Sequence, residues 1–333
     1  MSASVKRFVV SEAEAGLRAD KALTVLLPEV TRSFLKQRFD AGEVSVNDRA
    51  VKASRVLKAG EEIAVSIPEA APLEAVAEDI PLDILYEDDD VLVVNKPKGM
   101  VVHPAAGHSE GTLVNAILHH CGSSLSGING VMRPGIVHRI DKDTTGALLV
   151  CKNDYAHNAL AAQLKEHSIG RVYHAIVTGI IEEEEGTVDA PIGRSAKDRK
   201  KMAVMSEAEF RKGRGKRAVT HYSVLQRFYE AKLTYITCRL ETGRTHQIRV
   251  HMAHIGHPLL GDGVYGGRRK LSRVSQGDGY NDSLRAMSHC TRPLDSQCLH
   301  AMELSFTHPR TGERITCIAP LPEYFVNLID NFT

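Results

Sequence analysis

The chain has 333 residues, an apolar fraction of 43% and a formal net charge of +1 at pH 7. This length fits one large domain with a smaller one, or two of similar size, and the apolar fraction is ample for a packed core. The balanced net charge says nothing about partners, so any electrostatic signal must come from local clusters of charge.

The cysteines argue against a disulfide-linked or zinc-binding protein, and the hydropathy pattern argues against a membrane-spanning or secreted one. The six cysteines are scattered without a C-x-x-C pair, which fits reduced thiols better than a disulfide framework or a zinc site. No run approaches the ~20 apolar residues of a membrane span, and the N-terminus lacks the apolar core of a signal peptide. We therefore expect a cytoplasmic, monomeric protein without a membrane partner.

Residues 8–68 predict a compact module. Helical spacing over residues 18–27 and a second helix with Arg32 and Lys36 one turn apart precede short alternating strands. Two basic helices that lead into Gly42-Glu-Val-Ser-Val-Asn47 resemble the S4 RNA-binding module. The resemblance implies an α/β module in which Arg32 and Lys36 bind RNA, whereas the alternative is a basic face that is merely solvated.

A linker and a larger domain follow this module. Residues 69–79 are rich in Ala, Pro and acidic side chains and keep no apolar period, which predicts the linker. In residues 80–333 strands dominate and often follow one another through turns. This pattern predicts an α+β fold with a mixed, largely antiparallel sheet and flanking helices. Residues 268–296 are polar and irregular, so we expect a surface insertion there.

One segment of the larger domain is strongly basic. Residues 194–217 hold ten Lys or Arg against three acidic residues, with two glycines interleaved. Such a segment predicts a mobile basic arm that binds phosphates and releases their counterions, although a solvated loop is the alternative.

The central loop, residues 138–146, carries the densest polar chemistry of the chain. His138, Arg139, two aspartates and two threonines lie there between two apolar runs that resemble strands. Buried charge is costly unless it is paired. The loop is therefore either a structural turn, in which Arg139 pairs with Asp141 or Asp143, or a catalytic loop.

A phosphatase is one alternative for this loop. The residues Asp141-x-Asp143-x-Thr145 fit the D-x-D-x-T pattern of haloacid-dehalogenase phosphatases. Those enzymes place each acidic motif at the end of an apolar parallel strand. The chain lacks the required βα repeats, which argues against this chemistry.

A metal site is a second alternative. Four histidines crowd one later segment, at positions 246, 251, 254 and 257. There is no H-E-x-x-H pattern and no Cys partner, and Arg244 and Arg249 would repel a cation. We expect these histidines to pack and form hydrogen bonds, and we predict no metal.

The central loop closely resembles the signature H-R-L-D-x-x-T-[ST]-G of the RluA-type pseudouridine synthases, with Ile140 at the Leu position. Four further motifs resemble family landmarks and follow in the family's order: Asn95-Lys-Pro-x-Gly-x-x-Val-His-Pro104, Arg171-x-Tyr173-x-Ala175, Thr242-Gly-Arg-Thr-His-Gln-Ile-Arg-Val-His251 and His257-Pro-Leu-Leu-Gly-Asp262. The S4-like module matches the members that act on large-subunit ribosomal RNA, the RluD type.

The resemblance implies a role for three catalytic candidates. Asp141 would be the essential carboxylate, which either attacks covalently or starts glycal formation by removing the 2′ proton. It must be ionised in a dry pocket, so a fixed cation should stand beside it. Arg249 is our first candidate and Arg244 the second, and phosphate binding is the alternative for Arg249. Tyr173 would stack on the target base and could assist removal of the C5 proton.

The resemblance also implies which residues hold the substrate. Arg139 would fill the space that the flipped base leaves, because the enzyme cannot reach a stacked base. We group His138, Arg244, Arg32 and Lys36 with it as substrate-binding residues, and we expect His138 mainly to shape the loop.

The sequence thus predicts an enzyme that isomerises specific uridines to pseudouridine in RNA. The expected partner is large-subunit (23S-type) ribosomal RNA or a pre-ribosomal particle, which makes the protein part of rRNA processing. The reaction needs no redox step or phosphate activation, so no cofactor is implied. The rival from another class is a non-catalytic RNA-binding or ribosome-assembly factor with the same fold.

Overall fold

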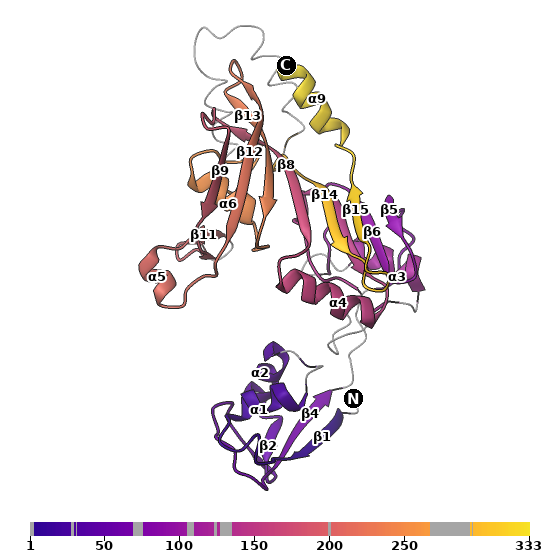
Figure 1. Ribbon diagram of the computed structural model, residues 1–333, viewed down its shortest axis with the longest axis vertical. Helices are drawn as coiled ribbons and strands as arrows, with labels where there is room; N and C mark the ends of the chain where they lie inside the picture. Colours follow the sequence, from indigo (N-terminus) through magenta and orange to yellow (C-terminus); the bar gives the residue numbers. More distant parts are fainter. Residues whose placement is uncertain are drawn as a thin grey trace. The chain divides into compact units, whose positions relative to one another are not determined.

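The computed structural model describes residues 3–27, 30, 32–68, 76–104, 110–122, 125–126, 135–198, 201–266, 294 and 296–333. The chain divides into two compact units, Met1–Val76 with Ser126–Pro134 and Ala77–Leu125 with Gly135–Thr333 (Figure 1). Most of the predicted linker and nearly all of the predicted insertion at 268–296 lie outside the described residues.

The smaller unit is a four-stranded antiparallel sheet with two helices, and its strand order is β1-β4-β2-β3. Its elements are β1 (Ala3–Val9), α1 (Ala19–Leu26), α2 (Arg32–Asp40), β2 (Val44–Val46), β3 (Arg49–Ala50) and β4 (Glu62–Pro68). Strand β1 begins before the start that the sequence predicts for the module, and it pairs with β4 along its whole length.

Apolar side chains at helical spacing build the core of the smaller unit. On α1, Ala19, Ala22 and Leu23 are buried, and on α2, Leu35 and Phe39 are buried against the same cluster. Burying each Leu or Phe stabilises the fold by about 2 kcal/mol relative to an exposed position. The polar faces of both helices are therefore left for solvent or a partner.

The larger unit contains a nine-stranded sheet in the order β5-β6-β7-β14-β8-β13-β12-β9, with β15 also paired to β14. Its strands are β5 (Ile84–Glu87), β6 (Val91–Lys96), β7 (Thr145–Cys151), β8 (Gly170–Thr178), β9 (Glu185–Asp189), β12 (Val219–Phe228), β13 (Leu233–Leu240), β14 (Leu299–Thr307) and β15 (Arg314–Ile318). Only the pair β7 and β14 is parallel among the described strands. The predicted α+β class with a mixed, largely antiparallel sheet is confirmed.

Four helices of eight residues or more accompany this sheet: α3 (Leu113–Cys121), α4 (Asp154–Lys165), α6 (Gln247–His254) and α9 (Glu323–Phe332). Side chains cap two of them, since Thr112 and Asn115 form a reciprocal capping box and Asn153 accepts the Ala156 N–H. Helix α4 packs against β7 and β14, and α6 packs against β12 (Figure 1). In the described part of the chain, no helix is long and apolar enough to cross a membrane.

The described residues of the basic segment 194–217 include regular structure. Strand β10 (Ile192–Arg194) pairs with β11 (Met202–Val204), and α5 (Glu207–Arg211) follows. Ser206 caps α5 by accepting the Glu209 N–H, while the Glu209 side chain reaches back to the Ser206 N–H. The mobility of this segment as an arm stays a prediction.

Strand β14 is the meeting point of the sheet around the central loop. It pairs with β7 at His300 and Ala301 and with β8 from Leu299 to Ser305, and from Glu303 onward it also pairs with β15. Gly146, at the start of β7, has a φ of +107°, and a Cβ there would lie 2.2 Å from the carbonyl oxygen of Ala301. Only glycine allows β7 and β14 to approach this closely. The apolar run before the loop, expected to be strand-like, forms only an isolated bridge between Ile136 and Val150.

Candidate active site

The central loop is held by a buried lysine at the end of β6. The Lys96 side chain is 0% exposed, and its Nζ donates to the carbonyl oxygens of Lys142 (2.8 Å), Pro97 (2.9 Å) and Met100 (2.9 Å). Three acceptors use all three donors of an ammonium group. Burial lowers the pKa of Lys96 to about 7, although the nearby aspartates of the loop oppose the shift. This lysine ties the strand to the residue that follows Asp141.

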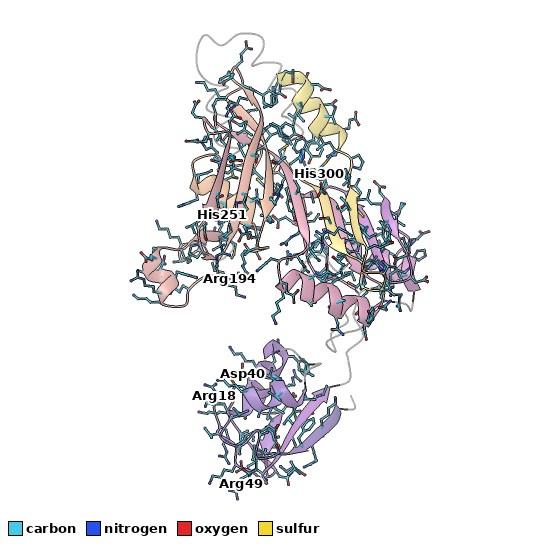
Figure 2. The ribbon with its side chains drawn as sticks, viewed as in Figure 1. Arg18, Asp40, Arg49, Arg194, His251 and His300 are labelled. Carbon is cyan, nitrogen blue, oxygen red and sulfur yellow. The ribbon has the colours of Figure 1, made fainter. Side chains whose placement is uncertain are left out.

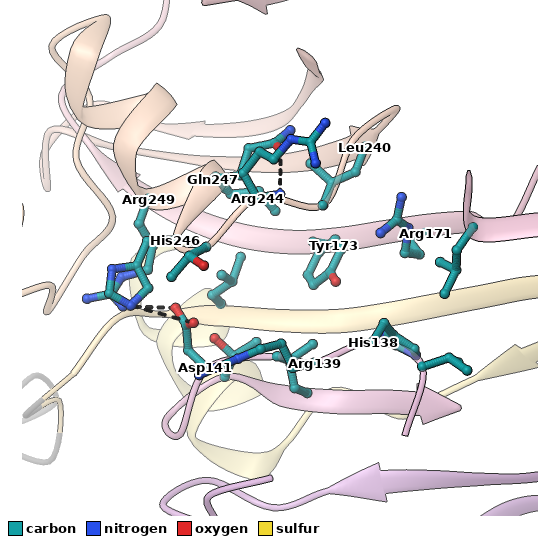
Figure 3. Close-up of a pocket in the computed structure, with 18 of the residues that line it drawn as sticks. His138, Arg139, Asp141, Arg171, Tyr173, Leu240, Arg244, His246, Gln247 and Arg249 are labelled. Atoms are coloured by element: carbon teal, nitrogen blue, oxygen red, sulfur yellow. Dashed lines mark hydrogen bonds and ion pairs between the residues drawn. The ribbon is translucent and has the colours of Figure 1, made fainter. Parts of the chain in front are cut away.

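Asp141 lies against a fixed cation. Its Oδ2 accepts a hydrogen bond from the Arg249 guanidinium at 2.8 Å (Figure 3). Arg249 is buried on α6 and also donates from Nε and a terminal nitrogen to Asp262, at 2.7 and 3.1 Å. Burial would lower the pKa of Arg249, but the two carboxylates outweigh it and raise that pKa. Arg249 is therefore charged and held in one orientation beside Asp141.

Asp262 fixes Arg249 from behind. Its side chain is 0% exposed, and Oδ1 also accepts the backbone N–H groups of Val264 and Tyr265 at 2.9 and 3.1 Å. The four donors on one carboxylate compensate its burial. The guanidinium is thus a rigid bridge between a buried structural carboxylate and the more accessible Asp141.

A histidine faces the other oxygen of Asp141. His246 precedes α6 in the left-handed region, with a φ of 57°, and its Nε2 lies 3.7 Å from Asp141 Oδ1. Its Nδ1 lies 2.8 Å from the hydroxyl of Tyr265, which itself accepts the Met202 N–H at 3.0 Å. The Tyr265 hydroxyl can donate its proton to Nδ1, and in that tautomer the neutral ring carries its N–H on Nε2, on the side of the carboxylate. Burial lowers the pKa of His246 and favours this neutral ring.

Tyr173 supplies an aromatic ring to the same site. It lies on β8, pairs with Ala301 of β14 and Cys238 of β13, and is 7% exposed. Figure 3 shows the ring between Asp141 and Arg171. Burial raises the pKa of the phenol, so Tyr173 is a neutral ring at physiological pH.

One pocket of about 340 Å³ brings together the six site residues that the sequence predicts in the larger unit. They are Asp141, Tyr173, Arg249, Arg139, His138 and Arg244. This grouping spans more than a hundred residues of sequence and joins the central loop, β8 and the segment around α6.

Three further predicted residues of the pocket, Arg139, Arg244 and His138, differ in their hydrogen-bond partners. Arg139 is exposed and forms no hydrogen bond with the described residues, so the structural turn in which it pairs with an aspartate is not observed. The Arg244 Nε donates to the carbonyl oxygen of Arg217 at 3.0 Å rather than to Asp141. His138 Nε2 accepts the Leu149 N–H at 3.0 Å, and burial lowers its pKa to about 3.

The two predicted residues of the smaller unit lie on α2. Lys36 is exposed there, whereas Arg32 begins the helix and its side chain lies outside the described ones. Their RNA contacts stay a prediction.

Three of the four histidines considered as metal ligands, at positions 246, 251 and 257, form hydrogen bonds with described residues. Buried His251 bonds Thr220 Oγ1 and the Ala190 carbonyl oxygen, each at 2.9 Å, and lies within the packed side chains of Figure 2. His257 bonds the Thr178 carbonyl oxygen at 3.0 Å. Within the described ranges, no three His, Cys, Asp or Glu side chains are placed to share a metal ion.

Sequence reasoning did not assign roles to four residues that shape this site: Lys96, His246, Asp262 and Tyr265. The first three lie inside the quoted motifs, so the signal was present. The motifs give order along the chain but not contacts, and Asp262 is brought to Arg249 only by the turn that follows α6.

Comparisons with known proteins agree with this geometry. The family model described as RNA pseudouridylate synthase matches residues 90–254. An uncharacterised RNA pseudouridine synthase of Bacillus subtilis is 49% identical, covering 96% of both chains. A Zymomonas mobilis protein named ribosomal large subunit pseudouridine synthase D is 47% identical, covering 96% of this chain and 94% of the relative.

The solved structures show the same fold. The human RNA pseudouridylate synthase domain containing 1 aligns with a TM-score of 0.53 and 26% identity, covering 74% of this chain and 86% of that chain. The fold and the matches define the class of the protein as an RNA pseudouridine synthase. The chain belongs to the RluA-type family, whose enzymes isomerise uridine to pseudouridine in RNA.

Proposed function

We propose that this enzyme modifies specific uridines of large-subunit ribosomal RNA, either free or in a pre-ribosomal particle. Relatives at 42–47% identity carry the name ribosomal large subunit pseudouridine synthase D, which supports this substrate. The cytoplasmic location and the monomeric state are part of the same proposal.

The observation that carries the assignment of the chemistry is the contact between Asp141 and Arg249. A carboxylate in a pocket stays ionised when a fixed cation donates to one of its oxygens. Arg249 does this on Oδ2 and leaves Oδ1 on the side of His246. Asp141 is therefore the group that we assign to the attack on C1′ or to removal of the 2′ proton.

The isomerisation needs only side chains that this pocket contains. The C1′–N1 bond breaks, the base turns, C5 bonds to C1′, the C5 proton leaves and N1 gains a proton. Tyr173 offers a buried ring on which the free base can stack, and its hydroxyl can assist the C5 proton. No electrons enter or leave, so the residues suffice without a redox partner.

Exposed cations are assigned to the RNA. Arg139 lies two residues before Asp141 and has no partner among the described residues, which suits a side chain that enters the RNA stack when the uridine flips out. Arg244 at the pocket and Lys36 and Arg32 on α2 are assigned to RNA binding, as is the basic segment 194–217. The smaller unit acts as an S4-like module in this proposal.

Mapping of pseudouridines tests the proposal. In a strain that lacks the protein, carbodiimide treatment and primer extension of large-subunit ribosomal RNA should show specific uridines without modification. The wild-type chain should restore them, whereas Asp141→Asn should not, with a loss of at least about 10⁴-fold in rate in vitro. The matched control is Asp143→Asn on the same loop, which should restore modification.

Restoration by Asp141→Asn would show that another group carries the chemistry. An unchanged map in the deletion strain would show that the substrate is another RNA.

A further inference from the structure

Arg171 is a largely buried cation that has no partner among the described residues. It lies on β8 two residues before Tyr173 and is 7% exposed. No hydrogen bond or ion pair joins its side chain to any residue that the structure describes. Its Nε is among the buried polar atoms without an acceptor. Buried guanidinium groups are normally paired, because removing the charge from water is costly. The acceptor is therefore expected from outside the protein.

A second donor faces the same space. The Nε2 of His138 accepts the Leu149 N–H, so the proton of the neutral ring lies on Nδ1. Burial and then the charge of Arg171 lower the pKa of His138, which keeps the ring neutral and places the two side chains within electrostatic reach. Figure 3 shows them on opposite walls of the pocket, at the end beyond Tyr173 from Asp141.

Among the described residues that line the pocket, Asp141 is the one carboxylate, and Arg249 occupies its Oδ2. None of these described residues supplies an acid that balances the two donors. A terminal nitrogen of Arg171 lies close to Gly243, where a Cβ would be only 2.6 Å from it. This end of the pocket therefore presents two donors, which favours an anion.

We infer that Arg171 and the Nδ1–H of His138 form a subsite for one phosphodiester of the RNA strand that carries the target uridine. Non-bridging phosphate oxygens match the forked donors of a guanidinium and bring the negative charge that Arg171 lacks. A uracil carbonyl would accept a hydrogen bond but leave the charge unbalanced. This inference rests on the proposed function, and it adds the contact that aligns the strand so that the uridine lies between Tyr173 and Asp141.

The first test compares Arg171→Gln with Arg239→Gln in the full-length protein. Arg239 is a matched control because it is exposed, pairs with Val172 on the opposite face of the sheet and has no described partner. With a 23S ribosomal RNA transcript, Arg171→Gln should weaken binding by about 10- to 100-fold and lower the salt slope of log K by about 0.7. At saturating RNA, kcat should fall by less than the affinity.

Stability separates this subsite from a structural role. Removing an unpaired buried cation should leave Tm unchanged or raise it. A fall of about 5 °C or more, with unchanged RNA affinity, would show that Arg171 serves the fold and would overturn the inference. Equal affinities of Arg171→Gln and Arg239→Gln would overturn it as well.

The second test identifies the ligand as a phosphate. In a synthetic RNA with a mapped target uridine, each flanking phosphodiester is replaced in turn by a neutral methylphosphonate. At one position the replacement should weaken wild-type binding about as much as Arg171→Gln does, and the two changes together should add little. Losses that multiply at every position would exclude a phosphate. If wild type makes no pseudouridine in this RNA, the proposed function fails; if wild type is active and the variant matches it, only the subsite fails.

Discussion

At the scale of single residues, two buried arginines of the pocket differ in whether they have a partner. Arg249 is enclosed by Asp141 and Asp262, and its orientation is fixed by three hydrogen bonds. Arg171 is buried just as deeply and has none in the described structure. A paired cation can set the ionisation of a catalytic carboxylate, whereas an unpaired one costs stability until a substrate arrives. In our proposals Arg249 therefore serves the chemistry and Arg171 serves the binding of the substrate.

Lys96 gives a prediction at this scale. Its pKa is about 7 in the folded protein because of burial, below the usual 10.5 that the unfolded chain would show. Between these two values the unfolded state binds more protons, so the free energy of unfolding should rise with pH in this window. Lys96→Met lacks this group, so the stability of wild type relative to Lys96→Met should increase from pH 7 to pH 10.

Chemical denaturation of both proteins at several pH values measures this difference. A difference that stays flat or falls as pH rises would contradict the prediction.

At the scale of elements, the site depends on how closely two strands approach. Strand β7 leaves the loop that carries Asp141 and runs parallel to β14, which in turn pairs with β8 and thereby places Tyr173. This contact explains why the signature motif ends in a glycine, Gly146, because the Ala301 carbonyl oxygen lies where a side chain would be.

The variant Gly146→Ala tests whether β7 and β14 need this close approach, and Gly312→Ala is its control for backbone strain. Gly312 also has a positive φ, +73°, but a Cβ there would meet nothing within 4 Å. Gly312→Ala should therefore lose about 1–2 kcal/mol from strain alone. Gly146→Ala adds a clash with backbone, so it should lose clearly more and lower kcat by moving Asp141 relative to Tyr173.

The free energies of unfolding and single-turnover rates of the two variants provide the comparison. Equal destabilisation would show that the approach of β7 and β14 is less constrained than the distance indicates.

At the scale of the whole molecule, the chemistry is assigned to the larger unit and part of the RNA binding to the smaller one. The larger unit has its own cores and contains every residue of the pocket, whereas the smaller unit has a separate core. Removing residues 1–76 should therefore weaken RNA binding by about tenfold or more while kcat at saturating RNA stays within a few-fold, because several phosphate contacts are lost without touching the pocket.

Filter binding and single-turnover assays on a 23S transcript measure the two quantities. A folded truncation that is inert at saturating RNA would contradict this division, and so would one with unchanged affinity.

Much of this protein could be predicted from the sequence because its determinants are local. Hydrophobic periodicity predicted the two helices of the smaller unit and the strand-rich larger unit, and five ordered motifs predicted the family and the six pocket residues. Two features that depend on hydrogen bonds were not predicted: Ser206 and Glu209 cap a helix inside the basic segment, and β1 pairs with β4 along its whole length.

The sequence by itself predicted which residues we assign to the chemistry, and it fixes the order in which they occur. Only the tertiary structure decided their partners: Arg249 rather than Arg139 or Arg244 lies against Asp141, Asp262 fixes it, and Arg171 is left without an acceptor. The physical reason is that a motif constrains spacing along the chain. The pairing of buried charges depends on distances between strands and loops that are far apart in sequence.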